Sequence, residues 1–288
     1  MIIETPFIFM KPNSPYIISE TQNLDGLFGV VDLMKEKQKG KGLKKYEPSV
    51  EATIYQADCF DFLKTLPEKS IDIIITDPAY SGMNNKMNFG NGRIVGKYQD
   101  RDNDKWFPEF KDDPETFLHF LKECHRVLKD NRHIYLMIDS FSLLTLGHLM
   151  REVFNMKNII VWDKVNIGMG HYFRRRHEFV IFATKGYRKL NARNIPDVWQ
   201  LKRITKSKYP TQKPVEVFER MLTGSIEKGF TVCDPFIGSG SSAIAALKAG
   251  CTFIGADISE KACRISADRI KHFAKYGKDI LQEKSALI

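Results

Sequence analysis

The chain has 288 residues, and its 44 Lys and Arg outnumber its 35 Asp and Glu, which gives a formal net charge of +9 at pH 7. No apolar run approaches the ~20 residues that a membrane-spanning helix needs, and the first residues lack the basic and apolar regions of a signal peptide. The five cysteines are scattered without metal-ligand spacing, so we expect reduced thiols, no metal site and a cytoplasmic location.

Residues 1–50 lack the pattern of a packed core. Turn residues near position 12 and a lysine-rich run at 35–45 predict an N-terminal arm that is partly disordered. From 51 to 280, short apolar runs alternate with helical patterns, which predicts one α/β domain with a mostly parallel sheet and helices on both faces. Residues 281–288 are expected to be a C-terminal tail. The expected strands are Ala52–Ala57, Ile71–Thr76, His133–Ile138, Ile159–Asp163, Glu178–Ala183, Thr231–Asp234 and Thr252–Asp257.

Helices are predicted between these strands. Apolar residues recur at helical spacing from Phe117 to Leu128, again after Pro214, and a small, Ala-rich helix is expected from Ser241 to Ala249. Two regions, 81–113 and 186–208, lack such periodicity, and the first is long and rich in Gly and Asn. We interpret both as inserts that form a lid or recognise the substrate.

Two loops that begin with an acidic residue and a proline each close an apolar run. Asp77-Pro78-Ala79-Tyr80 follows the strand at 71–76, and Asp234-Pro235-Phe236-Ile237-Gly238-Ser239-Gly240 follows the strand at 231–234. Ligands of open α/β sheets bind outside the carboxyl ends of the strands. The two loops are therefore predicted to form two halves of one site.

The glycine-rich half is predicted to bind a nucleotide-like cofactor. Gly238 and Gly240, just before a helix, let the backbone approach a ligand closely, and Asp257 at the end of the next strand can accept ribose hydroxyls. The same spacing fits NAD, or a tight turn without a ligand. A carboxylate at Asp234 would repel a pyrophosphate but attract a sulfonium and an α-amino group, so the residues favour S-adenosylmethionine over NAD.

The acidic half is predicted to hold a base. The Asp77 carboxylate and the Pro78 carbonyl can accept the two N–H bonds of an exocyclic amino group, while the Tyr80 ring stacks on the base plane. Held in this way, the amino nitrogen directs its lone pair at an approaching methyl group, and catalysis is positioning and electrostatics. A base in a duplex would have to be flipped out. In isolation the tetrapeptide is more simply a type I turn, and the second loop favours the functional interpretation.

These motifs and their order resemble the circularly permuted β group of S-adenosylmethionine-dependent DNA amino-methyltransferases, in which (D/N/S)PP(Y/F) precedes FxGxG. Between them, Tyr209-Pro210-Thr211-Gln212-Lys213-Pro214 resembles the HPTQKP segment of that family, which closes over the methionine part of the cofactor. The resemblance covers roughly 52–270. The chain departs from the family pattern by having Ala79 for Pro, Tyr209 for His and Asp257 for Glu.

The resemblance implies a Rossmann-like class I methyltransferase fold, with seven strands in the order 3-2-1-4-5-7-6 and only the seventh antiparallel. Thr231–Asp234 would then lie beside Ile71–Thr76. The implied catalytic residues are Asp77, Pro78 and Tyr80. The implied cofactor-binding residues are Asp234, Phe236, Gly238, Gly240, Ser241, Asp257, Thr211, Gln212, Lys213 and Asp58.

The basic clusters favour a polyanionic partner, nucleic acid above all. Arg174, Arg175 and Arg176 follow the aromatic residues Tyr172 and Phe173, and we interpret the arginines as contacts to DNA phosphates. The alternative is that these arginines lie in a solvated loop and bind no partner.

The function expected from the resemblance is sequence-specific methylation of adenine N6 in double-stranded DNA. Cytosine N4, an RNA base or a protein glutamine amide are alternative acceptors, and an inert fold that only binds nucleic acid is an alternative of another class. Cytosine C5 is disfavoured because no Pro-Cys pair occurs. The resemblance also suggests a homodimer, a cognate restriction endonuclease within a restriction-modification system, and a nucleoid-associated location.

Overall fold

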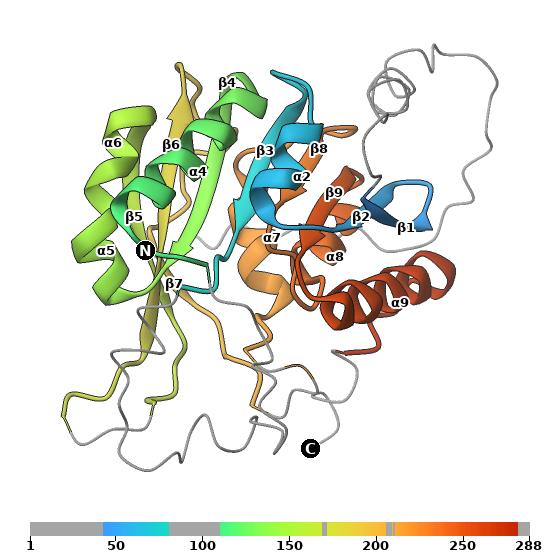
Figure 1. Cartoon of the computed structure of the whole chain (residues 1–288). Coiled ribbons are helices and arrows are strands. Elements are labelled where there is room, and N and C mark those ends of the chain that lie inside the picture. Colours follow the sequence, from blue (N-terminus) through green and yellow to red (C-terminus); the bar gives the residue numbers. More distant parts are fainter. Residues whose placement is uncertain (1–42, 81–109, 169–171, 206–208, 210, 282–288) are drawn as a thin grey trace.

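The structure, a computed structural model, describes residues 43–80, 110–168, 172–205, 209 and 211–281. This part of the chain forms one nine-stranded sheet with helices on both faces (Figure 1). The strands are β1 Lys44–Ser49, β2 Ala52–Gln56, β3 Ile71–Thr76, β4 Leu128–Ile138, β5 Asn155–Asp163, β6 His177–Lys185, β7 Val198–Gln200, β8 Thr231–Asp234 and β9 Thr252–Asp257. The helices are α2 Cys59–Thr65, α4 Pro114–Val127, α5 Ser140–Leu146, the 3-10 turn η1 Gly147–Leu149, α6 Met150–Val153, α7 Val215–Thr223, α8 Ser241–Lys248 and α9 Glu260–Tyr276.

The strand order β1-β2-β9-β8-β3-β4-β6-β5-β7 contains the seven predicted strands in the predicted sequence. Only β6 among these seven runs antiparallel to its neighbours, β4 and β5. At the centre β8 pairs with β3 in parallel, with Ile73 opposite Val232 and Ile74 opposite Cys233. The Rossmann-like methyltransferase fold implied by the resemblance is thereby confirmed.

The predicted count of seven strands was wrong, because two short strands extend the sheet at its edges. β1 lies within the region predicted to be an arm and pairs antiparallel with β2. Its side chains are exposed or half-buried, so it shows no apolar alternation that a sequence pattern could detect. β7 lies within the predicted insert 186–208, has three residues and pairs with β5. Residues 1–42 of the arm, 81–109 of the first insert and 282–288 of the tail lie outside the described residues.

The core consists of two apolar clusters, one on each face of the sheet. Helices α2, α4, α5 and α6 contribute to one cluster, and α7, α8 and α9 contribute to the other. All six residues of β3 are buried, and its side chains alternate between the faces, with Ile74 in the first cluster and Ile73 and Ile75 in the second. Burial on both faces explains why this strand is a continuous apolar run in the sequence.

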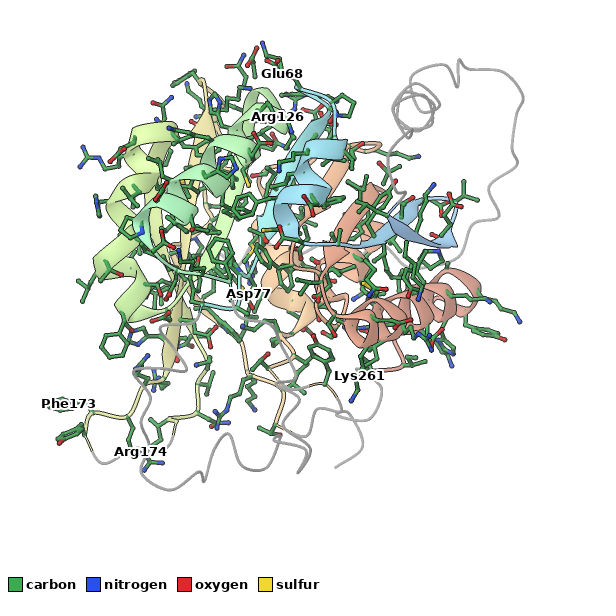
Figure 2. All side chains as sticks on the ribbon, viewed as in Figure 1. Glu68, Asp77, Arg126, Phe173, Arg174 and Lys261 are labelled. Atoms are coloured by element: carbon green, nitrogen blue, oxygen red, sulfur yellow. The ribbon has the colours of Figure 1, made fainter. Side chains whose placement is uncertain are left out.

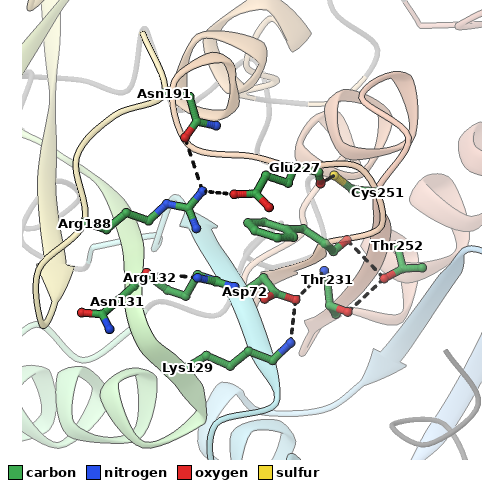
Figure 3. A network of polar contacts seen from close by, with 11 residues as sticks. Asp72, Lys129, Asn131, Arg132, Arg188, Asn191, Glu227, Thr231, Cys251 and Thr252 are labelled. Atoms are coloured by element: carbon green, nitrogen blue, oxygen red, sulfur yellow. Dashed lines mark hydrogen bonds and ion pairs between the residues drawn. The ribbon is translucent and has the colours of Figure 1, made fainter. Parts of the chain in front are cut away.

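A polar network joins residues at the amino ends of the central strands (Figure 3). The Asp72 side chain is buried, and its carboxylate accepts hydrogen bonds from Lys129 Nζ at 2.9 Å, Arg132 Nε at 3.1 Å and the Thr231 amide at 3.1 Å. The Arg132 guanidinium also covers the Phe230 ring, 4.6 Å from its centroid. One carboxylate therefore joins β3, β4 and the start of β8.

In the described ranges, no helix is both long and apolar enough to cross a membrane. The same residues contain no group of three or more His, Cys, Asp and Glu side chains that could hold a metal ion. All five cysteines are buried and free.

We expect Asp72→Ala to lower the free energy of unfolding by about 3 kcal/mol, because two cations and an amide lose a buried partner. Asp130→Ala is the matched control, since Asp130 pairs with Lys69 at 2.7 Å on the surface and is 54% exposed; it should cost less than about 1 kcal/mol. Urea unfolding measures both. Equal losses would contradict a special role for the Asp72 network.

Candidate active site

The two acidic-Pro loops lie side by side at the carboxyl ends of the central strands. Thr76, the last residue of β3, donates a hydrogen bond from its hydroxyl to Asp234 Oδ1 at 2.8 Å, and Asp234 is the last residue of β8. Figure 2 shows Asp77 at this edge of the sheet. The adjacency predicted for the two loops is therefore present.

Asp234 links the loops rather than presenting an open carboxylate. Its side chain is 1% exposed, and besides Thr76 it accepts hydrogen bonds from Ser242 Oγ at 2.6 Å and the Phe236 amide at 3.0 Å. Burial raises the pKa of the Asp234 carboxyl to about 7, against the lowering effect of these donors. The predicted attraction of cationic cofactor groups to this side chain stays a prediction.

The glycine-rich loop has the backbone of a ligand cradle. Gly238 and Gly240 have φ angles of 49° and 83°, in the left-handed region, and Gly240 caps the start of α8. A Cβ on Gly240 would lie 3.0 Å from the Ser266 Cβ on α9, so any other residue would crowd this neighbour. The loop thus needs glycine both for its conformation and for its close packing.

Asp257 lies at the end of β9, directly against this cradle. Its Oδ2 accepts a hydrogen bond from the Gly238 amide at 3.0 Å, and its Oδ1 accepts one from the Ser259 amide at 2.9 Å. Burial raises the pKa of the Asp257 carboxyl. Each oxygen retains acceptor capacity, so the side chain fits the predicted contact to ribose hydroxyls.

A buried arginine that sequence reasoning missed supports the cradle from behind. Arg269 on α9 is 0% exposed, and its Nη1 donates to the Ser239 carbonyl and to Ser241 Oγ, both at 2.9 Å. Its other nitrogens bind the Asp279 carboxylate at 2.8 and 2.6 Å. Nothing in the sequence distinguishes this arginine from the surface cations of an amphipathic helix, and its partner comes after the helix has ended.

The segment that resembles HPTQKP bridges the two loops. Ser241 Oγ on the cradle donates to the Lys213 carbonyl at 2.7 Å. Tyr209 is 5% exposed, and its hydroxyl would lie 3.6 Å from a Cβ placed on Gly238. Gln212 is buried and Thr211 is exposed with a left-handed φ of 58°, while Pro210 lies outside the described residues. The segment therefore lies over the cradle.

The Lys213 side chain was expected at the cofactor, but its ammonium lies in the other half of the site. Lys213 Nζ forms an ion pair with Asp77 Oδ2 and lies 3.6 Å from Glu178 Oε2. Glu178 in turn pairs with Lys164 Nζ at 3.0 Å. The result is a row of alternating charges, Lys164–Glu178–Lys213–Asp77, contributed by four separate segments.

This row of charges keeps the Asp77 carboxylate available as an acceptor. Burial raises the pKa of Asp77 and the ammonium of Lys213 opposes that rise, while the two carboxylates raise the pKa of Lys213 and keep it charged. The Asp77 side chain remains 27% exposed. A ligand can therefore reach a carboxylate that already has a cationic partner.

The Tyr80 side chain, which is predicted to stack on a base, is buried in the structure. Its ring is 4% exposed and contacts the Phe110 ring edge-on, with centroids 6.3 Å apart. Its hydroxyl donates to the Met137 carbonyl at 3.1 Å, and its amide donates to the Pro78 carbonyl at 3.1 Å. Packed in this way, the ring supports the loop from inside, and stacking on a base stays a prediction.

Phe236 and Asp58 lie at the same edge of the sheet. The Phe236 ring packs edge-on against Phe110 and Phe120, with centroids 5.5 and 5.6 Å away. Asp58 follows β2, the strand beside β9, and its exposed carboxylate caps α2 by accepting from the Phe60 amide at 2.8 Å. The predicted contact of Asp58 with the cofactor adenine stays a prediction.

The three arginines at 174–176 have three different partners within the structure. Arg176 pairs with Asp163 Oδ2 at 2.6 Å, and the Arg175 guanidinium lies over the Phe141 ring, 4.8 Å from its centroid. Arg174 donates from Nε to the Gly168 carbonyl at 2.7 Å and is exposed. Their predicted contact with DNA phosphates therefore depends most on Arg174, which is bound to a neutral carbonyl.

The chain is similar to DNA methylases over most of its length. Residues 71–268 match the N6/N4 methyltransferase family described as DNA methylase. The type II methyltransferase M.HhaII of Haemophilus parahaemolyticus is 31% identical over 206 residues, covering 69% of this chain and 87% of that protein. The DNA adenine methyltransferase YhdJ of Escherichia coli (strain K12) is 25% identical, covering 80% and 86%. The crystal structure of the M1.HpyAVI–SAM complex has a TM-score of 0.54 at 22% identity, covering 76% and 99%.

We expect Gly240→Ala to destabilise the protein by about 2–3 kcal/mol, because a left-handed alanine costs ~1–2 kcal/mol and its Cβ would crowd Ser266. Gly277→Ala is the matched control: it has a φ of 65° but no atom within 4 Å of the new Cβ, so it should cost only about 1 kcal/mol. Chemical denaturation of both variants separates backbone strain from crowding. A Gly240→Ala protein no less stable than the control would contradict close packing at the cradle.

Proposed function

Because the chain belongs to the N6/N4 DNA methylase family, we propose that it methylates the N6 amino group of an adenine that is flipped out of duplex DNA at a specific sequence. The observation that supports this best is the attachment of the Asp77 loop to the glycine cradle through Thr76 and Asp234. That attachment holds a base-binding carboxylate next to a cofactor cradle, as direct transfer between two substrates requires.

S-adenosylmethionine is the cofactor of this family, and the residues of the cradle fit it. The left-handed glycines admit close backbone approach, the Asp257 carboxylate retains lone pairs for ribose hydroxyls, and Phe236 offers a partly buried ring beside them. When bound, the cofactor supplies an electrophilic methyl group on a sulfonium. Thr211, Gln212 and the Lys213 backbone would close over it, since this segment lies against Ser241.

Asp77 and Pro78 would hold the amino group of the base. The Asp77 carboxylate accepts one N–H, and the Pro78 carbonyl, which has a second lone pair beyond the one used by the Tyr80 amide, accepts the other. Positive charge that develops on the amino nitrogen is then stabilised by the carboxylate. Lys213 has Glu178 as a second partner, so Asp77 can turn toward a base without leaving the ammonium unpaired.

Adenine is favoured over cytosine by the acidic first residue and the tyrosine of the Asp77 loop, which resemble the adenine-N6 members of the family. Similarity to an enzyme named as a DNA adenine methyltransferase supports the same assignment. Cytosine N4 is the second candidate, because the matching family includes both types of amino group.

The proposal extends to the setting of the enzyme. Similarity to a type II methyltransferase supports a place in a restriction-modification system. A cognate endonuclease, a homodimer and a nucleoid-associated position in the cytoplasm are further parts of this proposal.

Nucleoside mass spectrometry tests the reaction and the base together. Unmethylated plasmid DNA is incubated with the protein and S-adenosylmethionine carrying a labelled methyl group, and is then digested to nucleosides. Labelled N6-methyladenine is the expected product. Labelled N4-methylcytosine would refute the assignment of the base, and label in RNA or protein but not in DNA would refute the assignment of the substrate.

We expect Asp77→Ala to reduce methyl transfer at least ~100-fold, the usual cost of removing one electrostatic partner of the reacting group. Cofactor affinity, measured by calorimetry, should stay within about threefold, because Asp77 contacts neither Gly238 nor Asp257. Asp130→Ala serves as the surface-carboxylate control and should transfer at the wild-type rate. Substantial transfer by Asp77→Ala, or loss of cofactor binding with transfer, would contradict the assigned role.

A further inference from the structure

The loop between β5 and β6 exposes two adjacent aromatic side chains. Tyr172 is 93% exposed and Phe173 is 106% exposed, whereas the next most exposed aromatic side chain in the described ranges, Tyr187, reaches 70%. Exposed apolar side chains that adjoin one another, unlike single ones, can mark an interaction site. Among the described residues, the Phe173 ring has no packing partner.

Main-chain hydrogen bonds hold this loop as a hairpin up to the residues next to Phe173. The Lys164 amide donates to the Arg176 carbonyl, and the Gly168 amide donates to the Arg175 carbonyl, both at 2.7 Å. The Arg174 side chain adds a further bond, from its Nε to the Gly168 carbonyl. The position of the aromatic pair is therefore set by the hydrogen-bonded residues 174–176, which lie between it and β6.

The two ends of the hairpin belong to the row of charges that includes Asp77. Lys164 and Glu178, at the two ends of the hairpin, belong to the row of charges that reaches Asp77 through Lys213. In Figure 2, Phe173 and Arg174 project beyond the edge of the sheet, well away from Asp77. Phe173 lies five positions before Glu178 in the chain, so their Cα atoms are at most roughly 17 Å apart. The ring is thus away from Asp77 but within reach of a duplex that would dock over Asp77.

We propose that Phe173, with Tyr172 beside it, enters the base stack of duplex DNA next to the base that Asp77 receives, and fills the space which that base leaves. The inference rests on the proposed function. Inserted apolar side chains unstack a duplex step and stack on the neighbouring bases, which offsets part of the cost of flipping. Arg174, the exposed cation beside the ring, is placed to contact a backbone phosphate, and the net charge of +9 favours a polyanion over a second copy of the chain.

The test compares Phe173→Ala on two duplexes that contain the methylation site of this enzyme, once mapped. One duplex is fully paired, and in the other the target base lies opposite an abasic position, so that it is already unpaired. We expect kcat/KM of Phe173→Ala to fall at least ~10-fold on the paired duplex and by less than threefold on the unpaired one. Phe173→Trp should restore activity on the paired duplex. Tyr276→Ala is the control, because Tyr276 is an exposed aromatic residue on α9, 55% exposed, and should behave as wild type on both.

Fluorescence of 2-aminopurine at the target position gives a readout of flipping without chemistry, and the Phe173→Ala complex should show a smaller increase than wild type. An equal loss of kcat/KM on both duplexes, or no loss on either, would overturn the proposed insertion of Phe173. A wild-type dimer that becomes monomeric in Phe173→Ala would assign the ring to an interface between copies instead. If the wild type methylates neither duplex, the proposed function fails, and the insertion of Phe173 fails with it. If the wild type methylates DNA but Phe173→Ala does not show the expected difference, only the insertion fails.

Discussion

The buried carboxylate of Asp234 determines how the rest of the site is arranged. It accepts hydrogen bonds from the hydroxyls of Thr76 on β3 and Ser242 on α8, and so joins two central strands and the first helix after the cradle. Parallel neighbours in a sheet lie ~4.8 Å apart, and this link fixes the loops that follow the strands at a similarly close spacing. The Asp77 loop begins one residue after Thr76, and the cradle glycines Gly238 and Gly240 follow four and six residues after Asp234. One buried side chain therefore links the loops that form the two halves of the site.

Charge compensation is the second constraint on this edge of the sheet. Burying an ionised group without a partner is strongly unfavourable, and two charged side chains of the site have close counter-ions. Asp77 has Lys213, which is shared with Glu178, and Arg269 has Asp279. The two pairs serve different purposes: Arg269 is fully enclosed and rigidly bound behind the cradle, whereas Asp77 stays partly exposed, with a cation that has an alternative partner. The half of the site that must accept a large, flat substrate is thus the half in which ion pairs can rearrange.

The sequence was sufficient for the central strands and the two loops, because β3 and β8 are buried apolar runs that end in acidic-Pro motifs. It failed where a role depends on tertiary packing. β1 is polar on both faces, and β7 has only three residues, so neither has a usable period. Local sequence does not encode that the Lys213 side chain pairs with Asp77. Nor does it encode that the Tyr80 ring contacts Phe110, which lies thirty residues later in the chain. The predicted roles of Lys213 at the cofactor and of Tyr80 at the base stay predictions.

The most direct test of the link between the loops is the kinetics of Thr76→Val, which keeps the shape of the side chain and removes the hydroxyl that binds Asp234. A hydrogen bond to a charged group contributes ~1.5–3 kcal/mol, and loss of the tether should displace the Asp77 loop while the cradle stays in place. The account predicts a kcat at least ~10-fold below wild type with the affinity for S-adenosylmethionine within about threefold. An unchanged kcat, or a loss of cofactor affinity as large as the loss of kcat, would contradict it.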